Sequence, residues 1–209
     1  MINNFEKLVE RDVVHFSDPD LFYFVQLIKR KKENPNLKRS QKVIRSYYID
    51  SYADYYGKLQ DSIIRTCDEN NARAYIRVNR RSYFKSHIEM IKYLAELLSY
   101  QQYTKVRTAY DTVLGRSQNE TNKKWIIDVD YKDMEEKYET IEQGYLEIGD
   151  YIHTLLEESG NTMYGTVPTP NGLHIITGGF NSSKFAQEYP DIDIHKDNPT
   201  ILYTNLTNK

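Results

Sequence analysis

The sequence contains little cysteine, no long hydrophobic run and no excess of charge of one sign. Cys67 is the only cysteine among 209 residues, which excludes an internal disulfide and any zinc site built from several cysteines. The first residues are polar, so we expect no signal peptide. No apolar run approaches the length of a membrane span. These absences predict a cytoplasmic protein with no membrane partner.

The charge balance also excludes a general attraction to nucleic acid. The chain has 28 Lys and Arg residues against 30 Asp and Glu residues, a formal net charge of -2. Any surface that binds a polyanion must therefore be a local one. Hydrophobic residues make up 39% of the chain, as in a globular protein of one domain with or without a helical appendage. The 19 tyrosines favour a core whose edges are in contact with water over a surface that stacks on bases.

We expect the first 70 residues to form a helical N-terminal portion. One helix would begin at residues 17–20, with Pro19 in its first turn, would run into the cationic residues 29–32 and would stop near Asn34 and Pro35. That cationic run is either a solvated helix end or a patch that contacts phosphates. A second helix would span residues 41–66, because large apolar residues recur there at steps of three and four: Ile44, Tyr48, Tyr52, Tyr55, Leu59 and Ile63.

Residues 71–209 alternate between strand-like and helix-like patterns. This order predicts an α+β domain with a mixed sheet and flanking helices. The expected strands are residues 73–79, 104–114, 123–130, 162–167, 173–177 and 200–204. The expected helices are residues 82–101, 134–155 and 183–188.

Two aspartates follow a short β-prone run at residues 125–127. In a strand, alternate side chains share a face, so Asp128 and Asp130 should point the same way and Val129 the other way. Neighbouring carboxylates raise the cost of ionising both, and a divalent cation removes that cost. The alternative interpretation is a strand that runs into an acidic, solvated turn.

Two further groups of residues could bind an anion. His174 follows Gly172 in an expected strand, where a glycine allows close approach of a backbone or a ligand and a histidine could contact phosphate or metal. An ordinary core or surface histidine is the alternative. Four arginines near the expected helix start at residue 82 favour either a polyanion site or plain surface charge: Arg73, Arg77, Arg80 and Arg81.

The order of these motifs resembles the archaeo-eukaryotic primase superfamily, which includes primase small subunits and PrimPol-type enzymes. Residues 126–130 look like its first motif, residues 171–174 like its second, and residues 189–194 like the segment with its third aspartate. The resemblance covers about residues 70–205. It implies an RRM-like catalytic core, in a chain that could be a minimal, viral-type member.

The resemblance also implies roles for individual residues. Asp128, Asp130 and Asp193 would be catalytic and would hold two Mg²⁺ or Mn²⁺ ions, with Asp197 and Asp191 as alternatives for the third carboxylate. Four residues would bind the nucleoside triphosphate: His174, Asn171, Lys196 and Arg80. Three arginines would bind the nucleic acid: Arg77, Arg81 and Arg73.

The expected function is therefore template-dependent nucleotidyl transfer of the DNA primase and polymerase type. Its partners would be nucleoside triphosphates, a single-stranded nucleic-acid template and a replication partner such as a helicase or another subunit. Two alternatives stay open. One is a metal-dependent nuclease or phosphodiesterase that uses the same aspartates. The other is a non-catalytic nucleic-acid-binding protein that assists replication.

Overall fold

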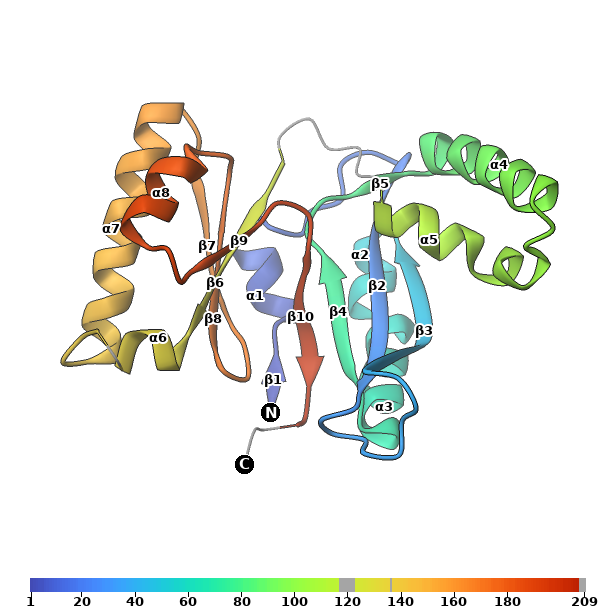
Figure 1. Ribbon diagram of the computed structural model, residues 1–209, viewed down its shortest axis with the longest axis horizontal. Helices are drawn as coiled ribbons and strands as arrows, with labels where there is room; N and C mark the ends of the chain where they lie inside the picture. The colour runs from blue at the N-terminus through green and yellow to red at the C-terminus, as the bar shows by residue number, and fades with distance from the viewer. Residues whose placement is uncertain (117–122, 136, 207–209) are drawn as a thin grey trace.

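Two sheets lie side by side, with helices packed around them, in the computed structural model of this chain (Figure 1). The structure describes residues 1–116, 123–135 and 137–206. The first sheet has the strand order β1-β10-β4-β2-β3, and a short strand, β5, also pairs with β2. The second sheet has the order β7-β8-β6-β9. The expected α+β class is confirmed, and the strand pairs of the described residues are antiparallel.

The first sheet combines strands from both ends of the chain. Its strands are β1 (Ile2–Asn3), β2 (Leu21–Arg30), β3 (Gln41–Ile49), β4 (Arg73–Arg77), β5 (Arg81–Ser82) and β10 (Pro199–Thr204). The second sheet is built from β6 (Trp125–Asp130), β7 (Met163–Pro168), β8 (Gly172–Thr177) and β9 (Asp193–His195). Because β2 pairs with β4, the expected division at residue 70 does not separate one sheet from the other.

Helices of very different lengths surround the two sheets. They are α1 (Phe5–Glu10), α2 (Tyr52–Tyr56), α3 (Lys58–Asn70), α4 (Tyr83–Ser99), the 3-10 helix η1 (Tyr103–Thr108), α5 (Ala109–Arg116), α6 (Tyr131–Glu135), α7 (Ile141–Ser159) and α8 (Ser182–Glu188). Ser82 begins α4 as its N-cap, since its side chain accepts a hydrogen bond from the backbone N–H of Lys85. None of these helices combines the length and apolar content of a membrane crossing in the part of the chain that is described.

The prediction of a helix that begins at residues 17–20 is wrong, and the prediction of a helix over residues 41–66 is wrong for its first part. Residues 21–30 form β2 and residues 41–49 form β3. From Tyr52 onward the predicted helix is confirmed, as α2 and then α3, which begins at Lys58. Strand β2 lies between β4 and β3, and its residues 22–25 are buried on both faces. A strand covered on both faces carries a continuous apolar run, which periodicity alone does not distinguish from a helix.

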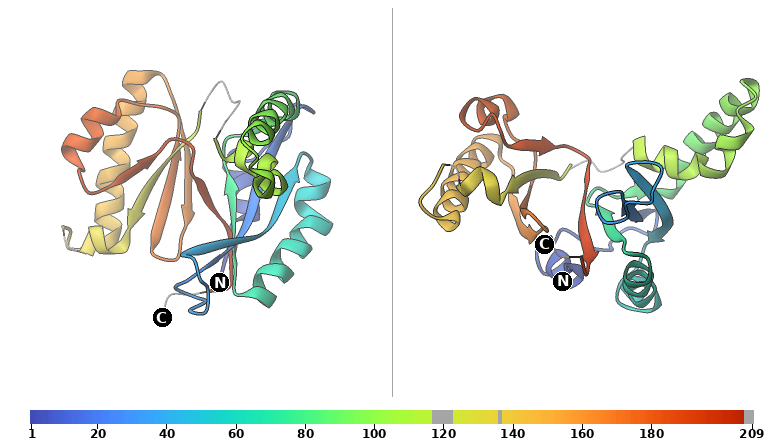
Figure 2. Two further views of the ribbon diagram at one scale, coloured as in Figure 1. Left: turned by 45° about the vertical axis from the view of Figure 1, so that its right-hand side comes forward. Right: turned by 60° about the horizontal axis from the view of Figure 1, so that its bottom comes forward.

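The expected strand at residues 104–114 is also wrong, because these residues form η1 and α5. The helix predicted over residues 82–101 is confirmed as α4, but its apolar stripe does not face the core. Phe84 is 70% exposed and Ile91 60% exposed. Figure 2 shows α4 and α5 projecting as a pair away from both sheets.

Three clusters of buried side chains hold these layers together. The largest lies between the first sheet, α1 and α3, and includes Ile126 and Ile176 from one face of the second sheet. A second cluster joins the opposite face of the second sheet to α7 and α8. A small third cluster packs Phe22 and Phe24 of β2 against Leu114 of α5. One face of the second sheet is therefore turned toward the first sheet, and a pocket opens between them.

Candidate functional site

A pocket of about 200 Å³ lies between the two sheets. The second sheet supplies acidic and imidazole side chains to its wall, and the first sheet supplies arginine and tyrosine. Its lining consists of Asp128, Asp130, Thr169, Pro170, Asn171, His174, His195, Asn198, Pro199, Ile201, Arg30, Arg73 and Tyr75. The pocket therefore combines negative and positive groups from separate parts of the chain.

Strand β6 positions the two carboxylates. Ile127 and Val129 are buried in the cluster beneath α7, so the alternate residues Asp128 and Asp130 point to the opposite face. Both line the pocket. Tight pairing of β6 with β8 depends on Gly172, because a Cβ there would lie 2.0 Å from the carbonyl oxygen of Val129. Gly172 thus permits the close approach of the backbone of β6.

His174 is opposite Asp128 in the register of β8 and β6. Its Nε2 lies 3.2 Å from Oδ1 of Asp128, and its Nδ1 lies 2.8 Å from Oγ1 of Thr200. With the ring proton on Nε2, the imidazole donates to Asp128 and accepts from the Thr200 hydroxyl. Nε2 of His195 lies 4.0 Å from the other oxygen of Asp128. The carboxylate of Asp128 therefore has an imidazole beside each oxygen.

The two carboxylates differ in their electrostatic surroundings. Burial alone would raise the pKa of Asp128, but the hydrogen bond and charge of His174, with His195 and Lys132, lower it below the ordinary value. Burial raises the pKa of Asp130, and the negative charges of Asp128 and Asp133 raise it further. The negative charge at Asp130 is thus the less well compensated of the two.

A divalent cation fits this carboxylate pair. Oxygen ligands are those that Mg²⁺ prefers, and it needs only one or two protein carboxylates because waters complete its shell. A positive ion would also relieve the repulsion between Asp128 and Asp130. Within the described residues, however, no group of three or more His, Cys, Asp or Glu side chains is arranged to hold a metal ion. The expected pair of ions stays a prediction.

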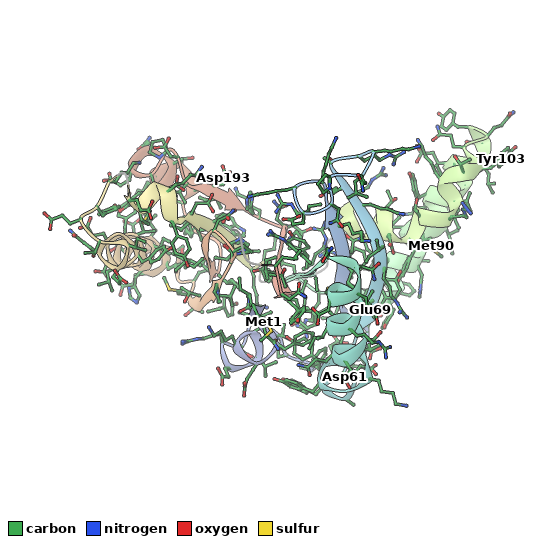
Figure 3. The ribbon with its side chains drawn as sticks, turned by 90° about the horizontal axis from the view of Figure 1, so that it is seen from below. Met1, Asp61, Glu69, Met90, Tyr103 and Asp193 are labelled. Atoms are coloured by element: carbon green, nitrogen blue, oxygen red, sulfur yellow. The ribbon has the colours of Figure 1, made fainter. Side chains whose placement is uncertain are left out.

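Asp193 lies on β9, directly opposite Asp128 in the register of β6 and β9. Paired residues of neighbouring strands point to the same face of a sheet, so its side chain shares the face of Asp128. Figure 3 labels Asp193 on its strand at one side of the molecule. Asp193 is exposed, and it forms no ion pair with any residue that the structure describes. It is not part of the pocket lining.

The two alternative third carboxylates already have cationic partners. Asp197 lies with its Oδ2 2.8 Å from Nη2 of Arg81 and 3.5 Å from Nη1 of Arg77. Asp191 lies 2.9 Å from Nζ of Lys137 on the surface. These pairs leave Asp193 as the candidate aspartate that faces the same way as Asp128.

The four arginines predicted as a polyanion site do not meet in the pocket. Arg73 lines the pocket, where its Nη2 lies 2.5 Å from Glu33. Arg77 donates to the backbone carbonyl of Asp197. Arg81 is fully buried and donates to the carbonyl oxygens of Leu114 and Asn79 at 2.8 Å each. Arg77 and Arg81 therefore connect parts of the fold and do not line the pocket.

Of the residues predicted to bind the triphosphate, some line the pocket and others do not. Asn171 lines the pocket beside His174. Arg80 is buried, and its Nη1 lies 3.3 Å from Oγ of Ser17. Lys196 holds its ammonium 4.5 Å from the centre of the Trp125 ring, outside the pocket lining. The structure thus places His174 and Asn171 in the pocket wall, but not Arg80 or Lys196.

Sequence reasoning missed four pocket residues of the first sheet or its edge: Tyr75, Asn198, Pro199 and Ile201. It singled out Arg30 only as part of the cationic run at residues 29–32. A signal for Tyr75 existed, because it shares a strand face with Arg73 and Arg77. The sequence pattern puts Arg30 at a helix end, and its strand placement becomes apparent only from the pairing of β2 with β3, where it lies opposite Gln41. Which side chains meet across the pocket depends on contacts that are distant in sequence.

Comparison of the chain with protein-family models, with curated proteins and with solved structures finds no match. The likeness to the primase superfamily therefore rests on the motifs of the sequence and stays a prediction.

Proposed function

We propose that this protein is a template-dependent nucleotidyltransferase of the primase and polymerase type. The observation that carries the proposal is the pocket, which sets Asp128 and Asp130 of one sheet in the same cavity as Arg30 and Arg73 of the other. Nucleotidyl transfer needs carboxylates near the attacking hydroxyl and cationic groups near the triphosphate. The pocket has both kinds of group on opposite walls.

The residues on the two walls of the pocket would have different roles. Arg30 and Arg73 would bind phosphate oxygens, since a guanidinium forms charge-assisted and often bidentate hydrogen bonds with them. His174 would orient Asp128 through the hydrogen bond already present, and Asn171 would contact the triphosphate. These contacts would speed the reaction by positioning and by electrostatic stabilisation of the charge that develops on phosphate.

Asp128 and Asp130 would hold a divalent cation, with Asp193 as the third carboxylate on the same sheet face. When bound, such a cation neutralises negative charge on the reacting phosphate oxygens. The low pKa of Asp128 keeps it ionised at neutral pH, as a metal ligand must be.

A second candidate is a non-catalytic nucleic-acid-binding protein that assists replication. One observation favours it: Asp128 already has a hydrogen-bonded imidazole, and the described part of the chain holds no three-ligand metal group. Such a protein would bind a strand without metal and without turnover.

One assay separates these functions. The protein is incubated with a single-stranded template, labelled nucleoside triphosphates and Mg²⁺ or Mn²⁺. Template-dependent products with release of pyrophosphate are the result expected for a nucleotidyltransferase. Release of nucleotides from a labelled strand without added triphosphate would identify a nuclease or phosphodiesterase instead. Binding of the strand with neither reaction would favour the non-catalytic role.

A further inference from the structure

The hairpin formed by β2, β3 and the loop between them concentrates positive charge in a chain whose net charge is -2. We call residues 29–45 the basic hairpin. This segment contains eight Lys or Arg residues and a single acidic residue, Glu33. Its cations are Lys29, Arg30, Lys31, Lys32, Lys38, Arg39, Lys42 and Arg45. Figure 1 shows its loop at the lower end of the first sheet, beyond the ends of β2 and β3.

These charges are not balanced by the rest of the fold. Seven of the eight cations are exposed, and Lys29 is half-buried. No ion pair involves any of the eight among residues 1–116, 123–135 and 137–206. Glu33, the one acid of the segment, is paired with Arg73 of β4. Clustered like charges that repel one another destabilise a fold unless a partner compensates them.

The basic hairpin is continuous with the pocket. Arg30 ends β2 and lines the cavity that contains Asp128 and Asp130. From Arg30 the charge continues through Lys31 and Lys32 into the loop and returns along β3, where Arg30 is opposite Gln41. A single triphosphate needs only the cations inside the pocket. A row of cations that leads outward from the pocket fits a long, repeating anion that leaves it.

We propose that the basic hairpin binds the phosphodiester backbone of the nucleic-acid strand on which the pocket acts. This inference rests on the proposed function and adds to it the surface that holds the strand. Strand residues are spaced about 3.3 Å apart, so a hairpin of this length reaches several successive phosphates. Each phosphate that a cation neutralises releases counterions, which gives single-strand binding a salt slope of about −0.7 per neutralised phosphate.

The test compares two variants from which the same amount of charge is removed. The hairpin variant is Lys31→Ser, Lys32→Ser, Lys38→Ser and Arg39→Ser, at four exposed loop positions. The control variant is Lys58→Ser, Arg65→Ser, Lys105→Ser and Arg107→Ser, at four exposed positions on α3 and η1. Affinity for a labelled single-stranded oligonucleotide is measured by fluorescence anisotropy across a salt series, and folding is checked by thermal unfolding.

We expect the hairpin variant to bind the oligonucleotide at least about tenfold more weakly at low salt. Its salt slope should be shallower by about 0.7 for each phosphate that is no longer neutralised. The control variant should keep most of the affinity, and binding of triphosphate should not change in either. An unchanged slope in the folded hairpin variant would overturn the proposal. So would hairpin-dependent binding to vesicles of anionic lipid with no effect on the oligonucleotide.

Failure of the hairpin proposal can be distinguished from failure of the proposed enzymatic function. If the native protein extends a template and the hairpin variant extends it equally well at limiting template, the basic hairpin has no such role although the enzyme assignment holds. If the native protein forms no product but its strand binding depends on the hairpin, the enzyme assignment fails and the binding surface remains.

Discussion

His174 connects Asp128 on the second sheet with Thr200 on the first. Its Nε2 lies 3.2 Å from the Asp128 carboxylate, and its Nδ1 lies 2.8 Å from the Thr200 hydroxyl. Asp128 belongs to β6 and Thr200 to β10, so one imidazole ring is hydrogen-bonded to both sheets at the wall of the pocket. The hydroxyl fixes the orientation of the ring, and the ring in turn fixes the carboxylate.

Removing the Thr200 hydroxyl should therefore disturb the Asp128 carboxylate through the imidazole. In Thr200→Val the shape is kept, but Nδ1 of His174 no longer has a hydrogen-bond partner. We expect nucleotide incorporation to fall about 10-fold or more, as for other residues that orient a ligand. Thr200→Ser keeps a hydroxyl and should restore most of the activity. Equal activity in the valine and serine variants would show that this hydrogen bond does not position the site.

Asp128 and Asp130 should be needed for metal binding as well as for activity. Asp128→Asn and Asp130→Asn remove the charges that a divalent cation requires. We expect each variant to lose most Mn²⁺ affinity, measured by calorimetry or by paramagnetic resonance, and to incorporate nucleotides at least about 100-fold more slowly. Asp191→Asn, a surface carboxylate paired with Lys137, is the matched control. Unchanged Mn²⁺ affinity in the first two variants would contradict the assignment.

The sequence could predict the local features of the site but not its partners. The shared face of Asp128 and Asp130 follows from the two-residue period of a strand, which is a local property. The pairing of His174 with Asp128 depends on the register of β8 against β6. Contacts with Thr200 and Arg30 depend on how two sheets pack together. No local pattern encodes such long-range contacts.

The errors in the first 70 residues also have a physical reason. The apolar residues Ile44, Tyr48 and Tyr52 are four apart, and a step of four returns to the same face in a strand as well as in a helix. Residues 44 and 48 lie in β3, whereas Leu59 and Ile63 lie in α3. The spacing fits both segments, but it does not show where one ends and the other begins.

Cys67 provides a test of the core beneath the first sheet. Its thiol is fully buried on α3, and burial raises its pKa to about 12. The reactive thiolate is thus a fraction of about 10⁻⁴ at pH 8, since each unit of pKa is a factor of ten. We expect no reaction with a disulfide reagent in the native protein and complete reaction in urea. Rapid labelling of the native protein would contradict the burial of α3 against the sheet.

Asp197 should matter for folding. Its carboxylate lies 2.8 Å from the guanidinium of Arg81, which is fully buried. In Asp197→Asn the arginine keeps its bonds to two carbonyl oxygens but loses the negative charge of this carboxylate. Removing one partner of a buried ion pair costs on the order of 3 kcal/mol, so the midpoint of thermal unfolding should fall by several degrees. An unfolding midpoint equal to that of the native protein would show that Arg81 does not need Asp197.

If Asp193 is the third carboxylate, it should matter for activity and not for folding, in contrast to Asp197. It is exposed and lies opposite Asp128 in the register of β9 and β6. Asp193→Asn removes no buried contact, so the free energy of unfolding should change by less than about 0.5 kcal/mol. Nucleotide incorporation should nevertheless fall sharply, because the sheet face beside Asp128 would then lack a negative charge that holds the cation. Measuring unfolding and incorporation for Asp193→Asn and Asp197→Asn side by side separates the two roles. A variant of Asp193 that is both stable and fully active would remove it from the site and leave Asp128 and Asp130 as the carboxylates that carry the chemistry.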